Sequence, residues 1–292
     1  MNPTDDPNPE TPSFHAPIDP PHPPEGHWTL DDIDYAAVDP RRLDGEPALL
    51  YLVAGASFVE IASDLYTRNL IEYFDGDDEL QDWLSSRWER EEVQHGHALR
   101  RYVRAAWPAF DWDGAFAAFY ADYSPLCKTE LLGPTRALEL AARCVVETGT
   151  ASYYTVIERV SPEPVLTDLA GRIRADEVRH YKYFYRYFRR YNERESLSRP
   201  QVFRTLASRL REVDDEDAYV AFKHVITAAH GIERFGRRDY RASRRLVMNL
   251  ARPHYPYRMA AKMILKPLSL NRYVQRAAVP LLSVGARYLL AH

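Results

Sequence analysis

The sequence predicts an all-α protein, a four-helix bundle with additional helices, and three observations support this. Long stretches contain almost no glycine or proline, and their apolar residues recur at the spacing of one helix face. The pattern Glu-x-x-His occurs twice, at Glu92/His95 and at Glu177/His180. A glutamate precedes each copy at a similar distance, since Glu60 lies 32 positions before Glu92 and Glu147 lies 30 positions before Glu177. That step equals about one helix, a short turn and half of the next helix.

Two helices are expected in the first half of this repeat. Residues 47–74 are apolar and contain no glycine except Gly55, and Asp75-Gly76-Asp77 then ends the helix as a turn would. Glu60 falls near the middle of this helix. Residues 79–106 form the second helix, which Pro108 stops. One face of it is traced, at spacings of three to five, by Trp83, Trp88, Glu92, His95, Leu99 and Tyr102.

The second half of the repeat predicts two more helices. After a less regular stretch with an aromatic cluster at 110–123, a third helix spans 134–160, because proline is accepted in a first turn. A fourth spans 164–192. Their inner faces carry Leu140, Cys144, Glu147, Thr150, Ala151 and Tyr154, and Ile173, Glu177, His180, Phe184 and Phe188. Helices of this size are each about 40 Å long, which places the glutamates and histidines at mid-height of the bundle.

These helices carry the pattern of a metal site. The six candidate ligands are Glu60, Glu92, His95, Glu147, Glu177 and His180. Positions i and i+3 share a helix face, so each Glu-x-x-His directs a carboxylate and an imidazole to one point. One glutamate from each of two helices, with Glu-x-x-His from each of the other two, holds a carboxylate-bridged iron or manganese pair in ferritin-like bundles. We therefore expect a ferritin-like bundle with a buried metal pair and a dry pocket beside it.

The alternative to a metal site is that the six residues are solvated charges on helix surfaces, since glutamate is rarely buried without a partner. With 20 Glu and 10 His in the chain, about one Glu-x-x-His is expected by chance. The sequence around the two lone glutamates disfavours this alternative. Glu60 lies in Phe58-Val59-Glu60-Ile61 and Glu147 follows Val145-Val146, whereas a solvated face needs polar neighbours.

Position in the pattern assigns a role to each ligand. We expect Glu92 and Glu177 to bridge the two metals, Glu60 and Glu147 to be terminal ligands, and one histidine to bind each metal. A carboxylate also precedes each motif glutamate, namely Glu91 and Asp176. Metal-bound histidines usually donate their other ring proton to such an acceptor, so these two are candidates for that role. The alternative is that both are ordinary surface acids. His97 is expected to be exposed, because it is offset by two residues from His95, and is not expected to be a ligand.

Two segments resemble the soluble acyl-carrier-protein desaturases. These are Trp88-Glu89-Arg90-Glu91-Glu92-Val93-Gln94-His95-Gly96 and Ala175-Asp176-Glu177-Val178-Arg179-His180. Thr150, three residues after Glu147, matches a threonine that this family keeps beside its oxygen site. The resemblance covers residues 48–192. It implies O2-dependent desaturation of a fatty acyl thioester carried on acyl carrier protein, catalytic involvement of Thr150, a ferredoxin-like electron donor and a homodimer. The implied cofactor is two Fe ions, and a Mn/Fe mixture fits the same ligands.

Other di-metal proteins match less well. A radical-generating ribonucleotide reductase subunit is expected to have tyrosine where this chain has Leu99. Ferritins generally lack the second complete Glu-x-x-His, and rubrerythrins add a cysteine-ligated iron site that is not encoded here. Three alternatives to desaturation stay open: hydroxylation or oxygenation of another substrate at the same metals, a non-enzymatic iron-binding or ferroxidase protein, and a partner-binding bundle with a vestigial site.

Composition divides the chain into three parts. Residues 1–28 contain nine prolines, five acidic residues and no Lys or Arg, which predicts a disordered arm rather than a targeting segment. The bundle domain is expected at 29–235 and a basic, amphipathic helical extension at 236–292. The cysteines, Cys127 and Cys144, form no Cys-x-x-Cys pair, so we expect neither a disulfide framework nor a rubredoxin-type iron centre. A reducing, cytoplasmic setting fits best.

Charge separates the extension from the bundle. From Arg234 onward there are 13 Lys or Arg and one acid, Asp239, so this part carries +12 and the preceding residues −16 of the net −4. A solvated basic face is the simplest interpretation. Functional interpretations are docking of an acidic protein or a phosphate-bearing substrate, or peripheral contact with an anionic membrane. The longest uncharged apolar run, 277–286, is too short to span a bilayer, and no recognised nucleic-acid-binding module accompanies the charge.

Overall fold

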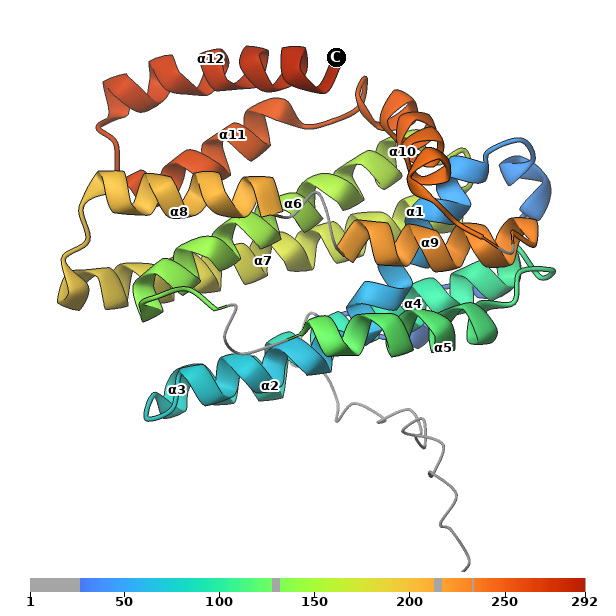
Figure 1. The fold of residues 1–292 in the computed structure, drawn as a ribbon, viewed down its shortest axis with the longest axis horizontal. Coiled ribbons are helices and arrows are strands. Elements are labelled where there is room, and N and C mark those ends of the chain that lie inside the picture. The colour runs from blue at the N-terminus through green and yellow to red at the C-terminus, as the bar shows by residue number, and fades with distance from the viewer. Residues whose placement is uncertain (1–26, 128–131, 213–216, 233, 292) are drawn as a thin grey trace, which may run out of the picture.

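The structure, a computed structural model, describes residues 27–127, 132–212, 217–232 and 234–291. Within these ranges the chain is helical and has no strand, which confirms the predicted all-α class. Figure 1 shows long helices packed side by side, with the last helices of the chain stacked along one side of them. The helices are α1 (Pro47–Ile61), α2 (Ser63–Tyr73), α3 (Asp78–Trp83), α4 (Glu89–Ala106), α5 (Trp112–Tyr123), α6 (Arg136–Val160), α7 (Pro164–Glu195), α8 (Arg199–Glu212), α9 (Asp217–His230), α10 (Arg237–Ala251), α11 (Tyr257–Leu265) and α12 (Arg272–Ala291).

Two helix pairs form the bundle. α1 packs along α4, α6 packs along α7, and α4 also contacts α7. These four helices carry the six candidate metal ligands. α6 begins at Arg136, two residues later than expected, and α7 ends at Glu195, three residues later than expected. The predicted bundle helices are therefore confirmed in place and order.

The first two expected helices are each interrupted near a ligand. The helix expected at 47–74 breaks at Ala62, whose φ of −82° and ψ of 9° lie outside the helical range, so α1 ends one residue after Glu60. The helix expected at 79–106 contains a π-helical turn, Leu84–Trp88, between α3 and α4. A π turn holds more residues than an α turn and changes the direction in which the following side chains point. This turn ends just before α4, which carries the first Glu-x-x-His.

The expectation of a less regular stretch at 110–123 is wrong, because residues 112–123 form α5. The Asp111 carboxylate caps the helix by accepting a hydrogen bond from the Gly114 N–H at 3.0 Å. Trp112, Phe116 and Phe119 bury their rings in the core from one face of this helix. Aromatic residues are weak helix formers, and burial of this face outweighs that weakness.

The apolar interior consists of two clusters separated by the candidate ligands. One cluster takes the N-terminal part of α1, the C-terminal part of α4, the N-terminal part of α7, and α5 and α9. The other takes α2, α3, the N-terminal part of α6, and the C-terminal part of α7. On α7, for example, Ile173 belongs to the first cluster and Tyr181 to the second, and Glu177 lies between them. The polar residues thus form a layer at mid-height with apolar packing above and below.

Segments outside the four bundle helices cover this interior. Residues 1–26 of the expected arm lie outside the described residues, but Trp28 is buried against the bundle, so ordered packing begins before residue 29. α9 packs on α1 and α5, α10 on α1, α8 and α11 on α6, and α12 on α11. One stretch, Pro47–Tyr73, is apolar and long enough to cross a membrane by composition, but 72% of its apolar window is buried, as in a core helix.

Candidate metal centre

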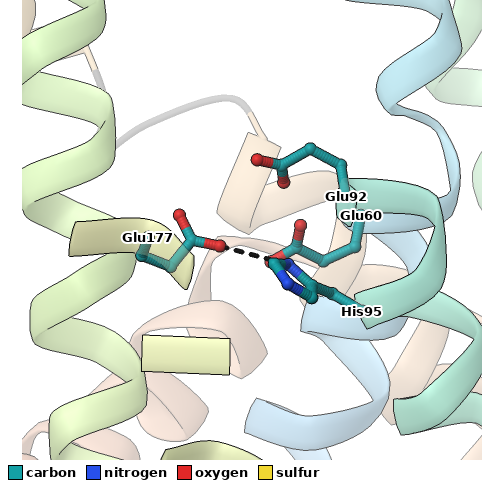
Figure 2. A group of neighbouring side chains, drawn as sticks. All are labelled: Glu60, Glu92, His95 and Glu177. Atoms are coloured by element: carbon teal, nitrogen blue, oxygen red, sulfur yellow. Dashed lines mark ion pairs between the residues drawn. The ribbon is translucent and has the colours of Figure 1, made fainter. Parts of the chain in front are cut away.

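The six predicted ligands converge at the centre of the bundle. Their ligand atoms form two groups, each within 4.8 Å: Glu60, Glu92, His95 and Glu177, and Glu92, Glu147, Glu177 and His180. Figure 2 shows the first group, with Glu60, Glu92 and His95 facing Glu177 from the opposite side. All six side chains are buried. Glu92 and Glu177 belong to both groups, which is the arrangement expected of bridging ligands.

Both histidines present the same ring nitrogen to the carboxylates. His95 Nδ1 lies 3.2 Å from Glu177 Oε1, the ion pair drawn in Figure 2. His180 Nδ1 lies 2.9 Å from Glu92 Oε1 and 3.7 Å from Glu147 Oε2. Each imidazole therefore directs Nδ1 into the site, and its Nε2 faces a carboxylate outside the two ligand groups.

The Nε2 atoms contact the two predicted carboxylates, Asp176 and Glu91. Each carboxylate contacts the histidine of the other motif. Asp176, which precedes the second motif, lies with Oδ2 3.0 Å from Nε2 of His95 in the first motif. Glu91, which precedes the first motif, lies with Oε2 2.7 Å from Nε2 of His180 in the second. Such contacts fix the tautomer and orientation of a ligand histidine. Both carboxylates therefore contact a candidate ligand histidine, which favours this role over the surface-acid alternative. The two contacts also join α4 to α7.

A second set of contacts, which sequence reasoning missed, orients Asp176. Trp28 Nε1 donates a hydrogen bond of 2.8 Å to Asp176 Oδ2, and its ring stacks on His95 with centroids 6.0 Å apart. Arg179 donates to the other oxygen of Asp176. The sequence signal for Arg179 was its place in the second resembling segment. Trp28 gave no signal, because it follows a proline-rich stretch.

Glu91 is likewise contacted by the N-terminal segment that contains Trp28, through the neighbouring residue His27. His27 Nδ1 lies 3.0 Å from Glu91 Oε1, and Arg87 Nε donates to the same oxygen at 3.3 Å. Adjacent residues, His27 and Trp28, thus contact the two carboxylates that orient the two ligand histidines. The N-terminal segment thereby closes this side of the site.

Two hydroxyl groups reach candidate ligands from α6. Thr150 Oγ1 donates a 2.6 Å hydrogen bond to Glu177 Oε2, so the threonine predicted as catalytic does lie at the centre. The Tyr154 hydroxyl donates to Glu60 Oε1, and this tyrosine is fully buried. Sequence reasoning placed Tyr154 on the inner face but gave it no role. The seven-residue spacing from Glu147, two helical turns, was the available signal.

Burial and crowding of like charges shift the acidities of the site. Removal from water, followed by repulsion from Glu177, raises the pKa of Glu92 to about 8. Burial and neighbouring carboxylates also raise the pKa of Glu60 and of Glu147 well above the ordinary range. Burial acts on Glu177 in the same direction, but the close contact with His95 Nδ1 and the charges of both histidines outweigh it, and its pKa is lowered. Without cations, therefore, burial and crowding favour the protonated form of Glu60, Glu92 and Glu147.

The polar atoms left without hydrogen bonds test whether metal ions fit. Among the described residues, the buried atoms that lack a hydrogen-bonding partner include His95 Nδ1, His180 Nδ1, Glu147 Oε2 and Glu177 Oε1. The Nδ1 atoms of both imidazoles lie close to carboxylate oxygens, but the geometry of these contacts is not that of a hydrogen bond. Buried polar groups without partners are costly, and these four converge on the two groups of ligand atoms. Carboxylate and imidazole suit iron and manganese, so each group could hold one such ion.

One glycine allows the ligand helices to approach each other. A Cβ on Gly96 would lie 2.6 Å from the Ile61 backbone nitrogen and 2.5 Å from Ile61 Cγ1. Gly96 follows His95 and Ile61 follows Glu60, so this contact sets the spacing between two ligands of the first group. The glycine of the first resembling segment therefore has a packing reason to be there.

Other features lie outside the site. His97, expected to be exposed, is instead partly buried on α4, and it belongs to neither ligand group. A buried ion pair, Arg143 Nε to Glu139 Oε1 at 2.7 Å, lies on α6 below Glu147 and was not anticipated. Two hollows, of about 750 and 400 Å³, are lined by residues 158–175 and 104–113, and neither is lined by a candidate ligand. The dry pocket expected beside the metals is not one of these hollows.

Comparison with known proteins adds a structural likeness. No family model and no curated protein matches this sequence. Among solved structures, the chain is similar to a mutant of an R2-like ligand-binding oxidase with an aerobically reconstituted Mn/Fe cofactor. The identity is 14%, the TM-score is 0.50, and the match covers 91% of this chain and 88% of that chain. The chain therefore has the ferritin-like helical fold of this oxidase.

Proposed function

We propose that this protein is an O2-dependent oxidoreductase that uses two metal ions held by the six central residues. The observation that carries the proposal is the pair of four-residue groups sharing Glu92 and Glu177. When bound and reduced, such a metal pair supplies activation of O2. Two irons are the first choice, and a Mn/Fe pair, as named for the similar solved structure, is the second.

We further propose that the substrate is a fatty acyl chain carried as a thioester on acyl carrier protein and that the reaction is desaturation. Support comes from the two sequence segments that resemble the acyl-carrier-protein desaturases and from Thr150. The hydroxyl of Thr150 donates a hydrogen bond to Glu177, a residue of both groups, and could hold a proton at that carboxylate. The apolar clusters on either side of the ligand layer would exclude water from the site.

Electrons must reach the site from a reductant, and we propose that they enter from the side of Trp28. Its indole contacts Asp176, and Asp176 contacts His95, so a continuous line of hydrogen-bonded groups leads from the N-terminal segment to a ligand. Arg87 and Arg179 lie at the same place and are each about one-third exposed. We propose that an acidic donor such as a ferredoxin-like protein contacts these two arginines, which already bind the carboxylates of Glu91 and Asp176.

The test is a single-turnover reaction with product analysis. Protein loaded anaerobically with Fe(II), with a Mn/Fe-loaded sample in parallel, is mixed with a long-chain acyl-carrier-protein and then exposed to O2. Mass spectrometry of the chain should show loss of two hydrogen atoms. A gain of one oxygen atom would instead identify a hydroxylase with the same metal site. Metal oxidation with the chain untouched would refute the acyl proposal and favour another substrate or a ferroxidase. The Glu177→Ala variant is the control for reaction at the site.

A further inference from the structure

We propose that α12 is an amphipathic helix that binds the surface of an anionic lipid bilayer and thereby attaches the protein to it. This inference does not depend on the proposed oxidase activity. Figure 1 shows α12 as an outer helix, with α11 between it and the bundle. Its inner side packs on α11 through buried Val279 and Ser283, and Ser283 Oγ donates to the Tyr257 carbonyl at 3.3 Å.

The outer side of α12 carries a continuous apolar stripe. Its members are Tyr273, Ala277, Leu281, Val284 and Tyr288, at spacings of four, four, three and four, which is one face of a helix. The exposed fractions are 70% for Tyr273, 74% for Leu281, 69% for Val284 and 65% for Tyr288. Exposed apolar residues are ordinary singly, but a row of them along one helix marks an interaction site. Tyrosines at both ends suit the boundary between lipid and water.

The charge around the stripe is entirely positive. From residue 240 to the end the sequence contains ten Lys or Arg and no Asp or Glu. On α12 itself, Arg272, Arg276 and Arg287 are exposed. Arg276 and Arg287 each adjoin a stripe residue in sequence, so their guanidinium groups border the apolar face. Cations bordering an apolar helix face are typical of helices that lie in the headgroup region of anionic membranes.

An anionic bilayer matches both the apolar stripe and the surrounding positive charge, whereas a second copy of this chain matches only one of them. Two copies packed stripe to stripe would bring the arginines of both α12 helices together, with repulsion between two strongly basic extensions. The acidic remainder of a second copy would pair with the cations but would leave the apolar stripe in water. The helix lies on the membrane rather than across it. The ten residues between Arg276 and Arg287 span about 15 Å, half of the hydrocarbon thickness.

Vesicle binding by the full-length protein tests the proposal. The protein should co-sediment with phosphatidylcholine vesicles that contain phosphatidylglycerol, more weakly with pure phosphatidylcholine, and less as salt is raised. The double variant Leu281→Asp/Val284→Asp should bind at least about tenfold more weakly. Arg276→Glu/Arg287→Glu should also weaken binding and remove the preference for anionic vesicles. The matched control is Phe203→Asp/Leu210→Asp, which changes two exposed apolar residues of α8 and should bind like the unaltered protein.

Three results would overturn the proposal. The first is no binding to anionic vesicles at low salt. The second is unchanged binding by the Leu281→Asp/Val284→Asp variant while circular dichroism shows all variants folded. The third is an oligomer of the unaltered protein, without lipid, that this variant dissociates. That last outcome would assign the stripe to a second copy of the chain.

Discussion

The two ligand groups predict different metal stoichiometries for variants of different ligands. Glu177 and Glu92 belong to both groups, whereas Glu60 belongs only to the group with His95, and Glu147 only to that with His180. Glu60→Ala should therefore leave one complete four-residue group and one tightly bound ion. Glu177→Ala removes a ligand from both groups and should leave no tight site. Glu89→Ala, one turn before Glu92 on the same helix and outside both groups, is the matched control.

The size of the effect follows from mass action. An ion at about 100 times its dissociation constant stabilises a folded protein by about 2.7 kcal/mol per site. Two intact sites thus give about 5 kcal/mol, or about 10 °C in melting temperature at roughly 2 °C per kcal/mol for a chain of this size. Glu60→Ala should retain about half of this metal-induced shift and Glu177→Ala little of it. Each variant is compared with its own metal-free form, since removing a buried carboxylate also changes the stability of that form.

The assay combines two measurements under anaerobic conditions. Equilibrium dialysis against Fe(II), with elemental analysis, gives the number of ions bound, and thermal unfolding with and without Fe(II) gives the shift. Glu92→Ala should behave like Glu177→Ala, and Glu147→Ala like Glu60→Ala. Two tight ions in the Glu177→Ala variant, or equal losses in all four variants, would show that Glu92 and Glu177 are not shared ligands.

Four further predictions follow from the site. Thr150→Val should retain both metals but change the rate or coupling of the O2 reaction, and unchanged turnover would reduce Thr150 to packing. Because each of these carboxylates contacts the histidine of the other motif, Glu91→Gln in a Glu60→Ala background should weaken the remaining ion about 10- to 100-fold, whereas Asp176→Asn there should change it little, as measured by metal titration. Gly96→Ala should destabilise the protein by about 1–3 kcal/mol in chemical denaturation, because its Cβ has no room against Ile61. Its control, Gly149→Ala, meets no atom within 4 Å and should be neutral or stabilising. Metal-free protein should lose stability as pH rises from about 4.5 to about 8, since Glu92 has a raised pKa and the folded state then holds protons that the unfolded state has released. The raised pKa values of His95 and His180 act in the same direction. A melting temperature that rises over this window would contradict the raised pKa values of Glu92 and the two histidines.

Local patterns in the sequence were enough to predict the four bundle helices and the six candidate metal ligands that the structure brings together. A helix face has a fixed period, so apolar spacing with Gly and Pro at the ends gave the positions of α6 and α7 to within three residues. The i, i+3 geometry of Glu-x-x-His is also local, and burial is indicated by the apolar neighbours of Glu60 and Glu147. The same reasoning made Glu91 and Asp176 candidates for contact with the histidines, with surface acids as the alternative, but did not say which histidine each would contact.

The interruptions near the ligands were less accessible to sequence reasoning. The break at Ala62 has no glycine or proline to mark it, and the π turn before α4 has no breaker residue either. α5 was not predicted, although its aromatic residues have helical spacing, because such residues are weak helix formers and only the folded structure shows their burial. These features depend on how helices fit against each other, and propensity is only a weak guide to that.

By itself, the sequence determined the all-α class, the four ligand-bearing helices and the six residues that meet between them, because each is encoded within one helix or by the spacing of consecutive helices. Only the tertiary structure decided the exchange of Glu91 and Asp176 between the two histidines, the packing of Trp28 on His95, and the outward stripe of α12. Those contacts join residues as far as 148 positions apart, as Trp28 and Asp176 are. Their partners are selected by the packing angles of whole helices, which no local pattern records.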